Sequence, residues 1–501
     1  MTTEDSGSNA LDTDTIVAIA SANGRGGVGI VRLSGPDAFA IAAHIAGSLP
    51  PPREAGFTSF RDSERRAIDN GIVLGFRAPA SFTGEDVVEL QGHGSPVALQ
   101  MLVKAAVHLG ARMARPGEFS ERAYLNGKLD LAQAEAVADL IAADSEAGAQ
   151  AALRSLRGEF SQLMHQLMDA LTAVRVQVEA AIDFPDEDIE LLADPALRAA
   201  LTALMAEVDH LRTRTRDGVL LTEGVKLVLL GAPNVGKSSV LNRLCGTDRA
   251  IVTDIPGTTR DLLHERIHIG GMPVELVDTA GLRVSDNAIE QEGIRRAETA
   301  ALEADLVLAV FDASDSASYR FITDRLQTIQ TNDQSVYHLL NSEQETIGRT
   351  PLQAPPARDA EPAATPILVV ANKADLLDQP IVLENLQALH AISDPKEPGA
   401  VLVSAKENSG FEELNERLVS MLKGSGDAAQ GVFSARTRHL VALEAAAVAL
   451  DDANVGIDAG IGAELVAEHL RYAQEELGSV CGELTRDALL GEIFSSFCIG
   501  K

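Results

Sequence analysis

The chain has 501 residues, of which 46% are hydrophobic and 4% aromatic, with no tryptophan. This length suggests about three domains. The formal net charge of -31 argues against unaided, tight binding to nucleic acid, because proteins that neutralise many phosphates are usually basic. The same charge disfavours adhesion to an anionic membrane.

The composition also favours a reducing, cytoplasmic setting. The three cysteines, Cys245, Cys481 and Cys498, are scattered and show neither a disulfide framework nor a metal-ligand spacing. The start of the chain, Met1 to Asp14, lacks the basic and apolar parts of a secretory signal. No apolar run is long enough to cross a bilayer.

The first part of the chain, to about Asn126, mixes short apolar runs with glycines. This pattern predicts an α+β domain over residues 1–127. We expect strands at Thr15–Ala20, Gly29–Leu33, Gly71–Phe76 and Asp86–Leu90, and a helix at Ser95–Leu109.

Two later stretches are rich in Ala, Leu, Gln and Glu with apolar residues at helical spacing: Leu129 to about Arg216, and about Ser434 to Phe494. An acidic turn at Asp183–Asp188 interrupts the first. We expect residues 128–217 and 425–501 to form one helical bundle that is split by an inserted domain. A separate C-terminal domain is the alternative.

Between these stretches, residues 218–424 alternate apolar strands with helical segments, which predicts a doubly wound parallel sheet. The expected strands are Lys226–Leu230, Val274–Val277, Leu306–Phe311 and Ile367–Val370. Within this region, Asn332–Thr365 is polar and ends rich in Pro and Ala, so we expect a surface insertion without fixed structure.

A phosphate-binding loop pattern begins at Gly231 and ends in Gly236-Lys237-Ser238. It follows an expected strand and opens an expected helix, which is the context that the pattern requires. Its glycines let backbone N–H groups turn toward one phosphate, and the helix N-terminus adds partial positive charge. Lys237 would reach the β- and γ-phosphates, and the Ser238 hydroxyl would bind Mg²⁺.

A second pattern concerns the base. Asn372-Lys373-Ala374-Asp375 follows an apolar strand and resembles the guanine-recognition turn of GTPases. A carboxylate there accepts two N–H donors of guanine, whereas adenine would leave it unpaired, so Asp375 selects GTP over ATP. Ser404-Ala405-Lys406 resembles the second loop that contacts the base.

The switch segments complete the GTPase order. Asp278-Thr279-Ala280-Gly281 resembles the loop whose aspartate holds Mg²⁺ through water, and Thr259 would complete the Mg²⁺ shell with Ser238. The predicted GTP-binding residues are Asn234, Val235, Gly236, Lys237, Ser238, Ser239, Thr253, Asp254, Ile255, Pro256, Gly257, Thr258, Thr259, Asp278, Thr279, Ala280, Gly281, Asn372, Lys373, Ala374, Asp375, Ser404, Ala405 and Lys406.

The residue that usually orients the attacking water in GTP hydrolysis is missing from this sequence. In Ras-like GTPases a glutamine follows the position that is Gly281 here, but this chain has Leu282. The segment Ile251–Asp261 resembles the K⁺-binding loop of cation-activated GTPases, in which K⁺ stabilises the developing phosphate charge. The expected K⁺ ligands are Asn234, Thr253, Ile255 and Thr258. A local turn cap is the alternative for Asn234.

Beyond these motifs, nearly the whole chain resembles the MnmE (TrmE) family of tRNA modification GTPases. The resemblance is carried by Gly24–Gly35, Ser81–Asp86, Glu89–Gly94, Arg115–Arg122, Asn126–Glu135 and the ending Phe497–Lys501. It implies a folate-binding and dimerisation domain of α+β type, a split helical domain, and an inserted Ras-like G domain of α/β type.

The resemblance also implies ligands and roles. A tetrahydrofolate derivative, 5-formyl- or 5,10-methylene-, would be bound by Arg32, Glu89, Lys128 and Lys501. Glu290 would position or polarise the water. Cys498 is open between a reactive thiol near the folate and ordinary apolar packing. Taken alone, each of the charged residues is a surface charge or an ordinary ion pair, and only the family motifs favour a ligand role.

As to function, the resemblance implies a homodimer that forms a heterotetramer with a flavin-containing partner, MnmG, and that acts on tRNA. Together they would add an aminomethyl or carboxymethylaminomethyl group to C5 of the wobble uridine, U34. A regulatory or ribosome-assembly GTPase is the alternative. A folate-dependent transferase with a vestigial G domain is the weakest alternative, because the GTPase motifs are intact.

One pattern is misleading. Gly24-x-Gly26-x-x-Gly29 fits the dinucleotide fingerprint literally, but Ile30–Leu33 reads as a strand where the fingerprint needs a helix. We therefore expect a loop near the folate and no NAD or FAD on this chain. FAD would be bound by the partner protein only.

Overall fold

The computed structural model describes residues 14–183, 194–247, 264–278, 304–326, 366–377, 400–423, 431–482, 487–495, 497 and 500. The chain divides into two compact units. The first comprises Met1–Ala142, Ala152–Thr213 and Thr437–Lys501, and the second comprises Ala143–Ala151 and Arg214–Arg436.

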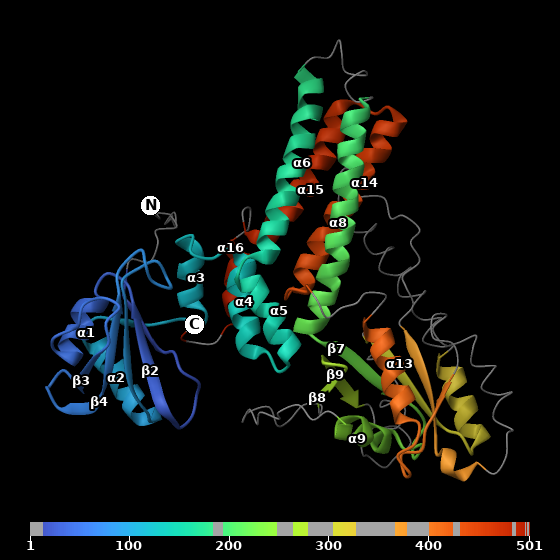
Figure 1. The fold of residues 1–501 in the computed structure, drawn as a ribbon, viewed down its shortest axis with the longest axis horizontal. Helices are drawn as coiled ribbons and strands as arrows, with labels where there is room; N and C mark the ends of the chain where they lie inside the picture. Colours follow the sequence, from blue (N-terminus) through green and yellow to red (C-terminus); the bar gives the residue numbers. More distant parts are fainter. Residues whose placement is uncertain are drawn as a thin grey trace, which may run out of the picture. The chain divides into compact units, whose positions relative to one another are not determined.

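The N-terminal part of the first unit is a six-stranded sheet with helices packed on one face (Figure 1). The strand order is β3-β4-β5-β2-β1-β6, and every neighbouring pair is antiparallel except β1 and β6. The elements are β1 (Ile16–Ile19), β2 (Gly26–Ser34), α1 (Ala38–Ala46), β3 (Gly56–Arg61), β4 (Ala67–Phe76), β5 (Val87–Gly94), α2 (Pro96–His108), β6 (Arg112–Met113) and α3 (Glu118–Leu125).

The sheet and α1 and α2 share one apolar core. Alternate residues of the central strands, such as Val31, Leu33, Val88 and Leu90, are buried against them. The Ser95 side chain accepts a hydrogen bond from the Ala98 N–H, and a proline follows it at the first helical position, so α2 begins where the sequence predicts. The expected strand at Ile30–Leu33 is confirmed as part of β2, but β2 already begins at Gly26, so the loop expected at Gly24–Gly29 is wrong from Gly26 onward.

Long helices from two stretches of the chain, one before and one after most of the second unit, form the rest of the first unit (Figure 1). α14 packs on α15, and α15 packs on α6, so segments that precede and follow the second unit share one bundle. Its helices include α4 (Leu131–Ala142), α6 (Glu159–Asp183), α14 (Thr437–Ala459), α15 (Ala463–Cys481) and α16 (Asp487–Ser495). Two further helices, α5 (Glu146–Leu156) and α8 (Pro195–Thr222), contribute residues to both units.

The second unit is built on a six-stranded sheet of order β12-β11-β10-β7-β9-β8. All neighbouring strands are parallel except β8 and β9, so the expected parallel sheet carries one antiparallel edge strand. The elements are β7 (Val225–Leu230), α9 (Lys237–Thr247), β8 (His264–Ile269), β9 (Met272–Asp278), β10 (Leu306–Asp312), β11 (Ile367–Asn372), the 3₁₀ turn η1 (Ala374–Leu376), β12 (Ala400–Leu402) and α13 (Phe411–Lys423).

Both faces of this sheet are covered. One apolar cluster joins alternate strand residues to α9 and α13, and a second joins the opposite residues to the helix at 316–326. Central strands such as β10 and β11 are buried along nearly their whole length, as a doubly wound sheet requires. The expected insertion, Asn332–Thr365, and the expected turn at 184–188 lie outside the described residues. No described helix meets the length and apolarity that a membrane crossing needs.

Candidate functional site

The phosphate-binding loop leaves β7 and enters α9, at the carboxyl edge of the sheet. Gly231 has φ +158° and Gly236 has φ +94°. A Cβ at Gly231 would meet the Val310 carbonyl oxygen at 2.2 Å, and one at Gly236 would meet the Asn372 Nδ2 at 2.3 Å. These two positions therefore need glycine for space as well as for conformation. Asn234 also has a left-handed φ of 64°.

The loop presents the chemistry that a phosphate requires. Lys237 Nζ donates to the carbonyl oxygens of Gly231 at 2.6 Å and Ala232 at 3.0 Å, so its ammonium lies over the loop. Ser238 and Ser239 are exposed in the first turn of α9, where backbone N–H groups have no helical acceptor. The structure thus brings a lysine, two hydroxyls and a helix N-terminus to one loop.

Asn372 ties this loop to the predicted base-binding loops. Its Nδ2 donates to the Val235 carbonyl at 2.9 Å, and its Oδ1 accepts from the Ala405 N–H at 3.1 Å. The residue is 2% exposed. A single buried amide therefore joins its own turn to two other segments, which lie 137 and 33 positions away in the sequence.

Asp375 is oriented by the third segment. Its Oδ1 accepts from the Ser404 hydroxyl at 2.6 Å, and Lys406 Nζ lies 3.7 Å from its Oδ2. The hydrogen bond from Ser404, helped by the charge of Lys406, lowers the pKa of this carboxyl group. A carboxylate held ionised in this way is an acceptor, which is what two N–H donors of a purine ring require.

Two residues of this site were not predicted from the sequence. Arg243 on α9 donates from Nε to the Ala405 carbonyl at 2.9 Å, which fixes the loop at 404–406. Asp312, the last residue of β10, pairs with Lys373 at 2.6 Å. Neither belongs to a recognised motif. The only signal for Asp312 was its place at the carboxyl end of an expected parallel strand.

A second group of predicted residues lies on the N-terminal sheet. Arg32 and Glu89 face each other across β2 and β5, and Arg32 Nη2 donates to Glu89 Oε1 at 2.9 Å. The other carboxylate oxygen accepts from Gln91 Nε2 at 3.1 Å. The Arg32 guanidinium lies 5.5 Å from the ring centroid of Phe82 and 5.7 Å from that of Phe119. Charged and aromatic groups therefore meet at one point of the sheet.

Lys128 lies by the loop at 77–86 that also carries Phe82. Its Nζ donates to the Pro79 carbonyl at 3.1 Å, and its stem lies 3.3 Å from where a Gly84 Cβ would be. The Asn126 amide donates to the Thr83 carbonyl at 2.8 Å. One loop thus contacts both Lys128 and Arg32, and Arg32 in turn pairs with Glu89, so the structure connects three of the four predicted folate residues.

The other predicted site residues lie outside the described part of the chain: Thr253, Asp254, Ile255, Pro256, Gly257, Thr258, Thr259, Thr279, Ala280, Gly281, Glu290, Cys498 and Lys501. Asp278 is the last residue of β9, with its side chain not described. Their roles therefore remain predictions.

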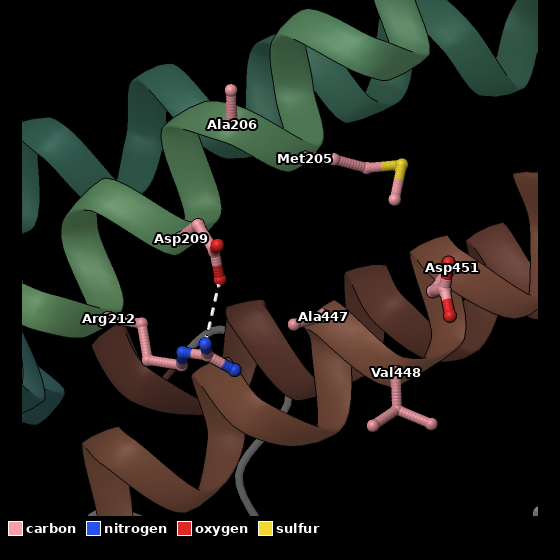
Figure 2. Close-up of a pocket in the computed structure, with 7 residues that line it drawn as sticks. All are labelled: Met205, Ala206, Asp209, Arg212, Ala447, Val448 and Asp451. Atoms are coloured by element: carbon pink, nitrogen blue, oxygen red, sulfur yellow. Dashed lines mark ion pairs between the residues drawn. The ribbon is translucent and has the colours of Figure 1, made fainter. Parts of the chain in front are cut away.

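The described structure also has a hollow in the helical bundle, with a volume of about 350 Å³. Figure 2 shows it between α8 and α14, with the ion pair of Arg212 and Asp209 at 2.9 Å on one side. Its lining residues are Met205, Ala206, Asp209, Arg212, Ala447, Val448 and Asp451. None of them belongs to a predicted site.

Comparison with known proteins bears on the whole chain. Residues 15–128 match the family model described as the GTP-binding protein TrmE N-terminus, and residues 131–498 match that of the MnmE helical domain. The chain is 47% identical over 492 residues to a protein of Aeromonas hydrophila named tRNA modification GTPase MnmE, covering 98% of this chain and 100% of the relative.

A second relative supports the same family, whereas a solved structure is only weakly similar. A protein of the same name from Methylococcus capsulatus is 46% identical over 493 residues, covering 98% of this chain and 100% of the relative. A solved structure, the FeoB G-domain from Methanococcus jannaschii, is 20% identical with a TM-score of 0.25, covering 40% of this chain and 98% of that one, which is too weak a likeness to support an argument. The family models and the near full-length relatives agree, and the chain belongs to the MnmE (TrmE) family.

Proposed function

We propose that this protein is a GTP-hydrolysing enzyme of tRNA modification. The observation that carries the proposal is the convergence of the phosphate-binding loop, the turn at Asn372–Asp375 and the loop at 404–406 through the buried Asn372 amide. The family membership and the names of the near full-length relatives support the link to tRNA modification.

The proposed roles in GTP binding follow from the chemistry of each group. The loop N–H groups and Lys237 would bind the phosphates, with Lys237 exchanging its two carbonyl partners for phosphate oxygens. Ser238 and Thr259 would hold Mg²⁺ directly and Asp278 through water. Asp375 would accept the guanine N–H groups. Glu290 would position the attacking water.

The first experiment tests the nucleotide specificity. Calorimetric titration of the purified protein with GTP and ATP, in the presence of Mg²⁺, should give binding with GTP only. The expected ratio of affinities is on the order of a thousandfold or more, because ATP would leave the Asp375 carboxylate without donors. Equal binding of both nucleotides, or of neither, would reject the proposal.

Hydrolysis is proposed to depend on K⁺. The ligands would be Asn234, Thr253, Ile255 and Thr258. GTP turnover should be higher in potassium than in sodium buffer, because K⁺ would stabilise negative charge that develops in the transition state. Equal turnover in the two buffers would contradict K⁺ dependence while leaving GTP binding intact.

The N-terminal sheet is the proposed folate site. Glu89 offers an acceptor for pterin N–H groups, Arg32 and Lys128 offer positive charge, and Phe82 and Phe119 flank the Arg32 guanidinium. This donor set fits a tetrahydrofolate derivative, with Lys501 as the fourth predicted ligand. The bound folate would supply the one-carbon unit. Titration with 5-formyl-tetrahydrofolate should give binding that is lost in R32A and E89A.

The protein is further proposed to act as a homodimer. The face of the N-terminal sheet opposite α1 and α2 carries Phe57, which is 79% exposed, cross-strand from the exposed Ile72. Val28 on β2 is exposed as well. Exposed apolar groups of this kind mark interaction surfaces. Ultracentrifugation should give a dimer, and F57K should shift it toward monomer.

The reaction on tRNA is the least direct part of the proposal. With the flavin-containing partner MnmG in a heterotetramer, the protein would add an aminomethyl or carboxymethylaminomethyl group to C5 of U34. The partner would bind FAD and supply most of the phosphate-binding surface, which suits the net charge of -31. Deleting the gene should abolish the modified wobble nucleoside in tRNA digests, whereas a ribosome-assembly GTPase would leave it unchanged.

A further inference from the structure

Asp312 lies where a nucleotide would meet the sheet, although no recognised motif includes it. It is the last residue of β10, and its Cα pairs with that of Asn372 at the end of the parallel strand β11. In doubly wound sheets, ligands bind beyond the carboxyl ends of the strands. Asp312 and the base-recognition turn therefore leave the sheet together.

The Asp312 carboxylate is fully engaged. Its Oδ2 accepts from Lys373 Nζ at 2.6 Å, and its Oδ1 accepts from the Ser314 N–H at 3.0 Å and the Ser314 hydroxyl at 2.6 Å. The Asp312 N–H donates to the Ser318 hydroxyl at 3.0 Å. Burial raises the pKa of the carboxyl group, but these hydrogen bonds and the Lys373 charge outweigh it and lower the pKa overall.

The pair differs from an ordinary surface ion pair in its surroundings. The Asp312 side chain is 13% exposed and that of Lys373 is 32% exposed. Partial burial weakens the screening by water, so the attraction is stronger than at a fully exposed site. The two residues are 61 positions apart in the sequence. The pair therefore fixes the base-recognition turn to β10.

Lys373 itself has an uncommon backbone. Its φ of 65° is left-handed, and the turn is closed by a hydrogen bond from the Leu376 N–H to its carbonyl oxygen at 3.0 Å. A lysine side chain has many rotamers, and ordering it costs entropy. If the Lys373 side chain is already ordered in the folded protein, this entropy is lost on folding and nucleotide binding does not lose it again.

We propose that Asp312 is a positioning residue for the guanine nucleotide, holding the Lys373 side chain in its binding geometry before the base arrives. The inference rests on the proposed GTP binding and extends it to a carboxylate outside the GTPase motifs. Asp312 acts through Lys373 and touches no part of the nucleotide itself.

The test is the dissociation rate of fluorescent GDP, measured by stopped flow with excess unlabelled GDP and Mg²⁺. D312N should speed dissociation about three- to tenfold, the equivalent of ordering one long side chain. D312E keeps the charge but displaces it by one methylene, and should speed dissociation less than D312N. Thermal unfolding of each variant identifies any that fail to fold, and D312E then serves in place of D312N.

A double-mutant cycle separates positioning from general damage. In a K373M background, D312N should add little or no further increase, because the residue through which it acts is already removed. D315N is the matched control. Asp315 lies three residues on and accepts from the backbone N–H groups of Ala317 and Ser318, and its variant should release GDP at the wild-type rate.

Two results would overturn this inference alone: wild-type dissociation from both D312N and D312E, or an equal acceleration in the wild-type and K373M backgrounds. A wild-type protein that does not bind GDP would instead overturn the proposed function, and this inference with it.

Discussion

At the scale of single residues, the nucleotide site depends on side chains that organise backbone as well as on those that meet the ligand. Asn372 uses its amide to join two loops, and Asp375 is oriented by Ser404 before any base is bound. The motif residues were recognisable in the sequence because their types and order are specific to GTP binding. Asp312 and Arg243 were not recognisable, because a single aspartate or arginine in the sequence does not show which group it will contact in the fold.

The first prediction concerns Asp375. D375N should lower GTP affinity about a hundredfold, because an amide NH₂ would face the guanine N–H donors that the carboxylate accepts. The same variant should gain affinity for xanthosine triphosphate, whose C2 carbonyl accepts from an amide. Calorimetry with both nucleotides measures the exchange.

K406M is the control for this prediction. It removes the charge that lies 3.7 Å from Asp375 but keeps the carboxylate. It should cost less than tenfold in GTP affinity, because the lysine of this pair is 79% exposed and its charge is screened by water. The assignment of Asp375 fails if D375N binds GTP as the wild type does.

At the scale of elements, the strongest sequence signals gave strands close to those observed. The expected strands at Thr15–Ala20 and Lys226–Leu230 correspond to β1 and β7, and the helix at Ser95–Leu109 corresponds to α2. Their signals are local: apolar runs mark the strands, and the structure shows that a capping serine and a proline begin the helix. Tertiary context adds little to such segments.

Elements with weak local signals were missed. The two-residue strand β6 exists only by parallel pairing with β1, and β3 is an edge strand with one fully buried residue, Phe60. The antiparallel edge of the second sheet was missed too, although Gly270-Gly271 between β8 and β9 is a two-residue hairpin signal. An apolar strand pattern does not show whether the neighbouring strand runs parallel or antiparallel to it.

The second prediction tests the phosphate-binding loop as an element. G231A should abolish GTP binding and lower the melting temperature, because the added Cβ would meet the Val310 carbonyl oxygen at 2.2 Å. Nucleotide titration and thermal unfolding measure the two effects.

G271A separates strain from collision. Gly271 also has a positive φ, +83°, but a Cβ there would meet nothing within 4 Å. G271A should therefore cost only the conformational strain, on the order of 1 kcal/mol, and leave GTP binding unchanged. If both variants bind GTP equally, the close approach at Gly231 is unimportant.

At the scale of the whole molecule, a buried charge cluster joins distant parts of the chain. Glu135 on α4 accepts from Arg438 Nη2 at 2.6 Å and lies 2.9 Å from His439 Nε2, both on α14. Arg438 also donates to the carbonyls of Ser479 and Val480 on α15. The cluster thus links α4, which precedes the second unit in the sequence, to α14 and α15, which follow it.

The pKa of Glu135 reflects this environment. Burial raises it, but the positive charge of His439 and the hydrogen bonds from His439 and Arg438 outweigh burial and lower the pKa from 4.5 to about 2. A depressed carboxyl pKa contributes stability above its unfolded value, and that contribution is lost as the pH falls through the folded value.

The third prediction follows. At pH 7, E135Q should lower the free energy of unfolding of the helical domain by about 3 kcal/mol, because it leaves buried positive charge without its partner. The difference from wild type should persist down to about pH 4.5 and then shrink toward pH 2. Denaturation followed by circular dichroism at several pH values measures it.

The control is E444Q, at an exposed glutamate of α14, which should unfold as the wild type does at every pH. A gap between wild type and E135Q that stays constant from pH 7 to pH 3 would show that the effect is steric and independent of the charge.

By itself, the sequence predicts the chemistry of this protein. Glycine spacing, the Lys237–Ser238 pair and the Asn372–Asp375 turn predict a phosphate loop and a guanine acceptor, because each is a short, local pattern. Local patterns also predicted strands such as β1 and β7 and the helix α2, but not the strands β3, β6 and β8.

Only the tertiary structure decided which charged residues meet. Asp312 and Lys373 are 61 positions apart, and Glu135 and Arg438 are 303 apart. No local pattern distinguishes such a carboxylate from one that faces water, because its partner is fixed by how strands and helices pack. The chain's chemistry is therefore readable in short segments, whereas the contacts that hold this chemistry in place are a product of folding.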